Sequence, residues 1–206
     1  MIKRVYTMAS ESYSNVYFSE NENGDAIMID CGSSENDIAD FVAKNRLNVK
    51  AVLLTHGHFD HIVGLKYADN RLIDVFIHES EVPMLADDEL NLSAYVGEKV
   101  PHIKRFKTLS EGKYDISGFN VEVIYTPGHT KGSVCYLIDK KLFSGDTLFY
   151  GTCGRYDFPS SDPAEMSRSL KKLLALDADL PVYPGHGRIT TVSNERKTFA
   201  YLINHQ

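Results

Sequence analysis

LTHGHFDH, residues 54–61, places four titratable side chains within six residues: His56, His58, Asp60 and His61. The stretch follows the apolar run VKAVLL at residues 49–54, which predicts a buried strand. In extended backbone, residues i and i+2 point to the same side, so His56 and His58 can converge on one point. Imidazole nitrogens and carboxylates are ligands that suit zinc, iron or manganese. The stretch therefore predicts a metal site directly after a strand.

A solvated loop is the alternative interpretation of this stretch. Four unpaired titratable groups are costly to bury together, so they are either exposed to water or held by a cation. One ion seldom takes four ligands from so short a segment, whereas two neighbouring ions could share them.

Three later motifs each place a further candidate ligand directly after an apolar segment. They are TPGHT at 126–130 with His129, FSGDTLF at 143–149 with Asp146, and YPGHG at 183–187 with His186. Loops at one edge of a sheet allow side chains from distant parts of a chain to converge. The four motifs together favour a metal site over a solvated loop.

Apolar runs of strand length alternate with helical patterns along the chain. Strands are predicted at residues 15–18, 26–30, 49–54, 74–78, 121–125 and 134–138. Ser33 or Ser34 can cap one helix, and DPAE at 162–165 is a start signal for another. A last helix is predicted over 192–204, and residues 87–102 are predicted to form a long loop. Strands interleaved with helices predict an α/β architecture.

Length and composition limit the possible classes of protein. The 206 residues suffice for one substantial domain, predicted over residues 1–206. A net charge of −6 argues against nucleic acid as a partner, but it does not exclude a small anionic molecule, and we expect a small-molecule substrate. No segment resembles a secretion signal or approaches the ~20 apolar residues of a membrane span, so we expect a cytoplasmic protein. Three cysteines do not suggest a disulfide framework.

The motifs as a set resemble those of the metallo-β-lactamase superfamily. They are THGHFDH, TPGHTKGS, GDTLF followed by GTCGRYD, and PGHGRITT, and they span residues 55–191. The set is most similar to the glyoxalase II (hydroxyacylglutathione hydrolase) branch and its short bacterial relatives. The resemblance implies a four-layer αββα sandwich with metals at one edge of the two sheets.

The same resemblance implies two divalent metal ions per chain, with zinc favoured and iron or manganese as alternatives. The first ion would be held by three histidines: His56, His58 and His129. The second ion would be held by Asp60, His61 and His186. Asp146 would bridge both ions. Asp30, in the stretch MIDCG, would orient one of the ligands, unless it only ends a strand or caps a helix.

Two metals about 3.5–4 Å apart can hold a hydroxide at neutral pH, which would attack an activated carbonyl. Asp60 or Asp146 could accept the proton, and the sequence does not distinguish them. A thiolate leaving group, with a pKa near ~8.5, departs without a positioned acid, whereas a lactam nitrogen needs a proton donor or a metal. Many zinc β-lactamases have cysteine where this chain has Asp146. These points favour thioester hydrolysis.

The identity of the thiol carrier is left open by the sequence. Longer glyoxalase II enzymes bind glutathione partly through a C-terminal helical domain, and this chain ends at Gln206 without room for one. Arg155 could clamp a substrate carboxylate, or it could form a structural ion pair with Asp157 or Asp162. Glutathione and another acyl-thiol carrier are both compatible with these residues.

Other functional classes share parts of the motif set. Persulfide dioxygenases resemble it too and use a single iron held by two histidines and an aspartate, which makes an oxidoreductase the main alternative. Inactive relatives tend to lose ligands, and all seven are present here. Nuclease relatives add a domain or a basic surface. The physiological substrate, the native metal and the oligomeric state are left open.

Overall fold

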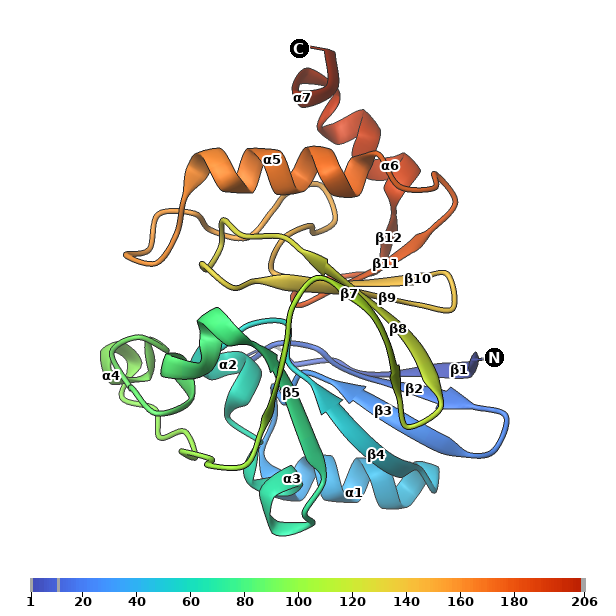
Figure 1. Ribbon diagram of the computed structural model, residues 1–206, viewed down its shortest axis with the longest axis vertical. Helices are drawn as coiled ribbons and strands as arrows, with labels where there is room; N and C mark the ends of the chain where they lie inside the picture. Colours follow the sequence, from blue (N-terminus) through green and yellow to red (C-terminus); the bar gives the residue numbers. More distant parts are fainter. Residues whose placement is uncertain (1, 11, 205–206) are drawn as a thin grey trace.

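The computed structural model describes residues 2–10 and 12–204. Two six-stranded sheets pack face to face, and helices cover both outer faces (Figure 1). Helices α1 (Glu35–Asn45) and α3 (Lys66–Asn70) lie on one side and α5 (Pro163–Leu174) on the other. The four-layer αββα sandwich implied by the motif set is therefore confirmed.

The first sheet contains strands β1 to β6 in chain order. Their bounds are β1 (Ile2–Met8), β2 (Val16–Asn21), β3 (Asp25–Ile29), β4 (Asn48–Leu53), β5 (Asp74–His78) and β6 (Lys107–Leu109). Strands β1, β2 and β3 pair antiparallel, whereas β3 to β6 are parallel. Parallel neighbours send their carboxyl ends to the same edge, which brings the loop after β3 beside the loop after β4.

The second sheet has the order β12, β11, β10, β9, β8, β7. Its strands are β7 (Gly112–Ile116), β8 (Phe119–Tyr125), β9 (Val134–Ile138), β10 (Lys141–Gly145), β11 (Pro181–Pro184) and β12 (Thr190–Thr191). All neighbours pair antiparallel except β10 and β11, which are parallel. The six strands predicted from apolar runs are confirmed as β2, β3, β4, β5, β8 and β9. The edge strands β1, β6, β7 and β12 were not predicted, because they contain no continuous apolar run.

The starts of the two long helices are confirmed as predicted. The Ser34 hydroxyl accepts the N–H of Asp37 at the start of α1, and the Asp162 carboxylate accepts the N–H groups of Ala164 and Glu165 at the start of α5. The remaining helices are short: α2 (Phe59–Ile62), the 3₁₀ helix η1 (Glu79–Leu85), α4 (Ser93–Val96), α6 (Val192–Thr198) and α7 (Ala200–Asn204). In the described part of the chain, no helix has the length and apolar character needed to cross a membrane.

The helix predicted over residues 192–204 is wrong in one respect, because it is divided into α6 and α7 at Phe199. The backbone of Phe199 leaves the helical region, and its side chain is buried in the apolar cluster beneath α5. Burial of the ring thus overrides the helical pattern there. The loop prediction for 87–102 holds apart from the single turn of α4.

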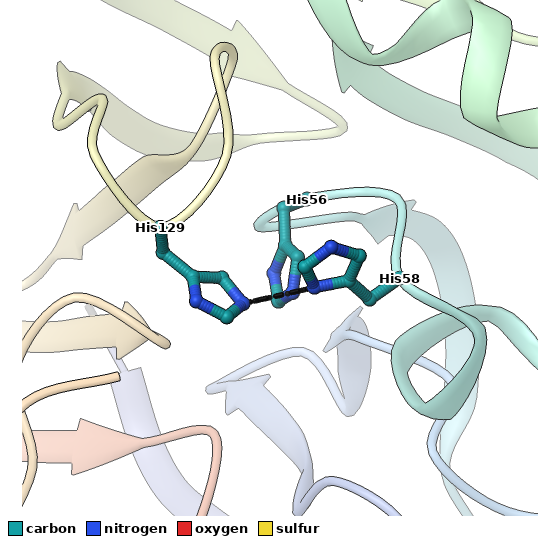
Figure 2. Close-up of side chains that lie close together, drawn as sticks. All are labelled: His56, His58 and His129. Carbon is teal, nitrogen blue, oxygen red and sulfur yellow. Dashed lines mark hydrogen bonds between the residues drawn. The ribbon is translucent and has the colours of Figure 1, made fainter. Parts of the chain in front are cut away.

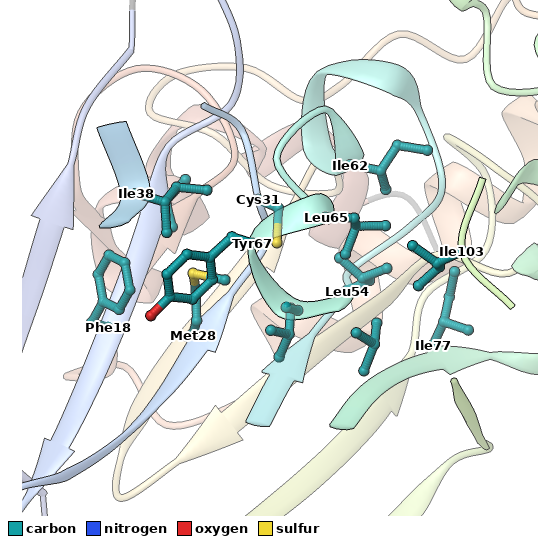
Figure 3. Packing of buried hydrophobic residues seen from close by; sticks show 14 of the residues in the cluster. Phe18, Met28, Cys31, Ile38, Leu54, Ile62, Leu65, Tyr67, Ile77 and Ile103 are labelled. Carbon is teal, nitrogen blue, oxygen red and sulfur yellow. The ribbon is translucent and has the colours of Figure 1, made fainter. Parts of the chain in front are cut away.

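Both faces of the central strands are buried, which explains their uninterrupted apolar runs. In β2 and β3, Phe18 and Met28 point toward α1, where they join a cluster that includes Ile38 (Figure 3). Their neighbours Tyr17 and Ile27 point the other way, into the core between the two sheets. This alternation follows from the two-residue period of a strand.

The two sheets are fastened to each other beside the loop that carries LTHGHFDH. The N–H of Val134 in β9 donates to the carbonyl of Thr55 at 2.9 Å. The buried hydroxyl of Tyr136 donates to the carbonyl of Leu54 at 2.7 Å. The position of His56 is therefore fixed by contacts from both sheets.

We expect Asp162→Ala to lower the free energy of unfolding by about 1 kcal/mol, because it removes the side chain that accepts two N–H groups at the start of α5. Urea denaturation monitored by circular dichroism measures this change. Asp40→Ala, at an exposed position in the middle of α1, is the matched control and should change stability by less than about 0.5 kcal/mol. Equal stability of the two variants would contradict the assigned cap.

Candidate metal centre

Three buried imidazoles from the two sheets meet at one point (Figure 2). His56 and His58 come from the loop after β4, and His129 comes from the turn after β8. The distances are 3.1 Å from His56 Nε2 to His58 Nδ1, 2.9 Å from His58 Nδ1 to His129 Nε2, and 3.2 Å from His129 Nε2 to His56 Nε2. The structure thus brings together the three residues predicted to hold the first ion.

A second group of candidate ligands adjoins the first. Its members are Asp60, His61 and His186, and their ligand atoms lie within 4.8 Å of one another. The Nε2 atom of His186 lies 3.0 Å from Asp60 Oδ2. His186 follows β11, so this group also draws on both sheets.

Asp146, directly after β10, lies between the two groups. Its Oδ1 atom is 3.2 Å from His61 Nε2, and its Oδ2 atom is 3.5 Å from both His129 Nε2 and His186 Nε2. The two oxygens therefore face ligands of both groups, which is the position that a bridging carboxylate requires. A Cβ at Gly185 would lie 2.2 Å from Asp146 Oδ1, so the close approach of that loop requires glycine.

Hydrogen bonds on the far side of each ring determine which nitrogen carries the proton. His129 Nδ1 donates to the carbonyl of Arg155 at 2.7 Å. The Thr55 hydroxyl donates to Asp30 and therefore accepts from His56 Nδ1 at 3.1 Å. With Nδ1 protonated in both rings, the lone pairs on Nε2 of His56 and His129 point at each other.

This donor set fits a divalent cation. Two facing lone pairs repel, and a positive ion between them converts that repulsion into two attractive contacts. His61 Nε2 and Asp146 Oδ1 are buried and make no hydrogen bond within the described part of the chain. Buried polar atoms are normally satisfied, so a ligand that supplies positive charge suits this place.

The electrostatics of the first group keep its histidines neutral, as metal ligands must be. Burial, with His129 as the next cause, lowers the pKa of His58 to about 3. Burial and the neighbouring histidines hold the pKa of His56 well below its usual value. The pKa of His129 is also lowered, chiefly by burial. Protons therefore compete weakly with a cation at these three rings.

The second group favours positive charge instead, either as a proton on His61 or as a metal ion that displaces that proton. Burial alone would lower the pKa of His61, but the carboxylates of Asp30, Asp146 and Asp60 raise it well above its usual value. Burial likewise opposes ionisation of Asp60 and Asp146, yet nearby His61 holds both carboxyl pKa values below their usual range. The carboxylates thus remain charged and attract a cation.

Asp30 occupies the position expected of a residue that orients a ligand. Its Oδ2 atom accepts from His61 Nδ1 at 2.9 Å, and its Oδ1 atom accepts the N–H of Thr55 at 2.8 Å. Its backbone is left-handed, with φ 60°, so the carboxylate turns toward the ligands directly after β3. Through Thr55, Asp30 also fixes the ring of His56.

Glu81, on η1, is a residue of this site that the sequence did not reveal. Its carboxylate accepts the N–H of Gly57 at 2.9 Å and the N–H of Gly132 at 2.7 Å. Gly57 lies between His56 and His58, and Gly132 follows His129 by three residues. One fully buried carboxylate therefore joins the two loops that supply the first group of ligands. A single glutamate in HESEVPML carries no motif from which this could be read.

Arg155 lines the cavity beside the metal ligands but makes an ion pair of its own. Its guanidinium donates to both oxygens of Asp157 at 2.9 and 3.0 Å and lies 4.3 Å from the centre of the Phe158 ring. Of the two partners considered for a structural ion pair, the structure shows Asp157, whereas Asp162 caps α5. The guanidinium is exposed at the side of the cavity.

The comparisons with known proteins agree with this geometry. A family model for the metallo-beta-lactamase superfamily matches residues 9–186. The chain is similar to the Bacillus subtilis protein YqgX, named a probable metallo-hydrolase, with 34% identity over 91% of this chain and 92% of that protein. It is also similar to the hydroxyacylglutathione hydrolase GloC of Haemophilus influenzae, with 31% identity over 88% of this chain and 89% of that protein.

Two crystal structures show the same similarity in three dimensions. The B3 metallo-beta-lactamase BLEG-1 superposes with a TM-score of 0.90 and 32% identity, covering 97% of this chain and 99% of that one. TTHA1623 in a di-iron-bound form gives a TM-score of 0.85 and 31% identity, covering 95% of this chain and 98% of that one.

We expect Glu81→Gln to weaken metal binding by about 10- to 100-fold, the usual cost of losing a partner that orients ligands. A glutamine offers one acceptor, and its amide N–H₂ would face one of the two backbone N–H groups. Isothermal titration of the metal-free protein with Zn²⁺ or Co²⁺ measures the effect. Glu79→Gln, at an exposed position on the same short helix, is the matched control. Unchanged affinity in Glu81→Gln, with circular dichroism like that of the parent, would contradict the role of Glu81.

Proposed function

This chain belongs to the metallo-beta-lactamase superfamily, and from that membership we propose that it is a hydrolase with a binuclear metal centre that cleaves a thioester. The position of Asp146 is the observation that carries the proposal. One oxygen faces His61, and the other faces His129 and His186. A carboxylate shared in this way supports two ions rather than the single iron of a persulfide dioxygenase.

When bound, two divalent ions would supply a water-derived nucleophile at neutral pH and polarise the carbonyl of the substrate. The protein's own contribution is to orient these groups and to remove a proton. Both oxygens of Asp146 are directed at ligand nitrogens, whereas Asp60 faces them with Oδ2, so Asp60 is the better-placed proton acceptor. Its side chain is 18% exposed, and Oδ2 contacts His186 Nε2 at 3.0 Å. Phe158 and Phe149 pack against the ligand rings and limit access of bulk water.

The chemistry of the leaving group supports a thioester. Among the described residues that line the cavity, there is no lysine or tyrosine that could donate a proton, and Arg155 is engaged by Asp157. A thiolate needs no such donor, whereas an amine leaving group benefits from one. The similarity to GloC, a hydroxyacylglutathione hydrolase, supports the same choice.

We further propose zinc, iron or manganese as the resident metal, and a small molecule as the substrate. Histidine and carboxylate ligands accept all three metals, and a di-iron form is known for the similar structure of TTHA1623. The net charge of −6 supports a substrate other than nucleic acid.

The deciding experiment combines elemental analysis with a panel of substrates. Protein purified without added metal is analysed for zinc, iron and manganese, and then assayed with an acyl-thioester, a β-lactam and a persulfide. We expect two ions per chain and hydrolysis of the thioester at the highest rate. One iron per chain with oxygen consumption on persulfide would overturn the proposal in favour of the dioxygenase. Faster hydrolysis of the β-lactam would agree with a metallo-hydrolase but would overturn the proposal that its substrate is a thioester.

We expect Asp146→Ala to lose both ions together and to lower kcat/KM by more than about 100-fold, since a direct ligand should cost at least as much as a partner that orients one. Metal content and rate are measured on the same preparation. Asp69→Ala, at an exposed position on α3, should retain both ions and full activity. Full activity of Asp146→Ala after the loss of a single ion would contradict a shared carboxylate.

A further inference from the structure

A cavity of about 340 Å³ opens directly beside the candidate metal ligands. Its lining includes four of these ligands: His58, His129, Asp146 and His186. The lining also includes four apolar side chains: Phe59, Leu92, Phe149 and Phe158. All four are half-buried, so each covers part of the protein interior and presents part of its surface to the cavity.

Two phenylalanine rings flank the ligands at opposite ends of the centre. The Phe158 ring centre lies 5.4 Å from that of His58 and 5.9 Å from that of His129. The Phe149 ring centre lies 5.8 Å from that of His186. Both groups of candidate ligands are therefore bordered by aromatic carbon.

The charge of the cavity also disfavours an anionic acyl group. Arg155 is the only arginine or lysine among its described lining residues, and its guanidinium is held by both oxygens of Asp157. Apart from Arg155 and the candidate metal ligands, the side chains in the described lining that carry a polar atom are Thr152 and Cys153. An anionic acyl group would therefore have to compete with Asp157 for the one arginine of the described lining.

Leu92 is held in the cavity wall by its neighbour Asn91. The backbone of Leu92 is left-handed, with φ 71°, which is uncommon for a leucine. Fully buried Asn91 fixes it: its carbonyl accepts the N–H of Phe59 at 2.8 Å, its amide donates to the carbonyl of Met84 at 3.0 Å, and its Oδ1 accepts the N–H of Ser93 at 2.9 Å. Unfavourable backbone conformations of this kind persist where the surrounding structure imposes them, often at ligand clamps.

We propose that this cavity binds an apolar acyl group and that Leu92 limits the length of that group. The proposal rests on the proposed thioester hydrolysis, because it takes the carbonyl carbon to react beside Asp60 and Asp146. The acyl chain continues from that carbon, and the space available to it is the cavity lined by Phe59, Leu92 and Phe158. A hydroxyl on the chain would face these side chains without a hydrogen-bond partner.

The first test compares acyl chains on one small, neutral thiol, N-acetylcysteamine, with metal-loaded protein. We expect kcat/KM to rise about fourfold for each methylene from acetyl through butanoyl, the ratio that burial of a methylene predicts. The lactoyl ester, which adds a hydroxyl to the propanoyl chain, should react more slowly than the propanoyl ester. A flat series, or a faster lactoyl ester, would overturn the proposal while leaving thioester hydrolysis intact.

A binding measurement tests the apolar acyl site independently of thioester hydrolysis. Isothermal titration of the metal-loaded protein uses acetate, propanoate and butanoate, the products of the same series, together with the longer acid hexanoate. We expect the same gain in affinity per methylene from acetate to butanoate, and a smaller gain per methylene from butanoate to hexanoate, because Leu92 limits the length of the chain. A gain in affinity without hydrolysis of any thioester would support the apolar acyl site and overturn the proposed reaction. Equal affinity for all four acids would overturn the site.

Variants of Leu92 test its role as the limit on chain length. Leu92→Gly removes the side chain and accepts a positive φ without strain, so it should shift the preferred substrate to longer chains. Leu92→Phe enlarges the side chain and should shift the preference to shorter ones. Leu90→Ala, two residues away and outside the cavity lining, is the control and should leave the series unchanged. An identical series in all four proteins would overturn the role of Leu92.

Discussion

The lone pairs of His56 Nε2 and His129 Nε2 face each other across 3.2 Å, and each ring is locked in that orientation by a hydrogen bond on its far side. The two rings belong to different sheets. Other contacts hold the two rings in this arrangement: Glu81 joins the two loops, and Tyr136 and Val134 fasten the second sheet to the end of β4. A cation bound between the two nitrogens would turn their facing lone pairs into two attractive contacts.

Much of this arrangement could be predicted from the sequence, since its signals are local. The apolar run before LTHGHFDH predicts strand β4, and the alternation of residues after it predicts that His56 and His58 point to the same side. Asp162 followed by proline predicts the start of α5. The convergence of His129, Asp146 and His186 could be anticipated because each follows an apolar segment that ends at the same edge. The family resemblance added the pairing of ligands into two groups.

The parts that the sequence did not reveal depend on contacts between distant segments. Glu81 matters because it lies opposite two backbone N–H groups, and a backbone N–H has no signature in the sequence. Leu92 lies in a stretch without hydrophobic periodicity. Its positive φ, which is visible only in the structure, shows that the surrounding residues hold it in place. The break at Phe199 likewise depends on what the ring packs against rather than on helix propensity. Sequence motifs identify candidate metal ligands more readily than the residues that hold those ligands in place or line the cavity beside them.

The division of the ligands between two sheets also orders events during synthesis. The first sheet ends with β6 at Leu109, and the second begins with β7 at Gly112. A chain is made from its N-terminus, so the loop that carries His56, His58 and His61 is made before the turn that carries His129. Domains generally fold as units, and the two sheets share one apolar core, so neither group of ligands is complete until the later half has packed onto the earlier one. Capture of metal is consequently a late step in maturation, and a nascent chain displays a histidine-rich loop before it has a site.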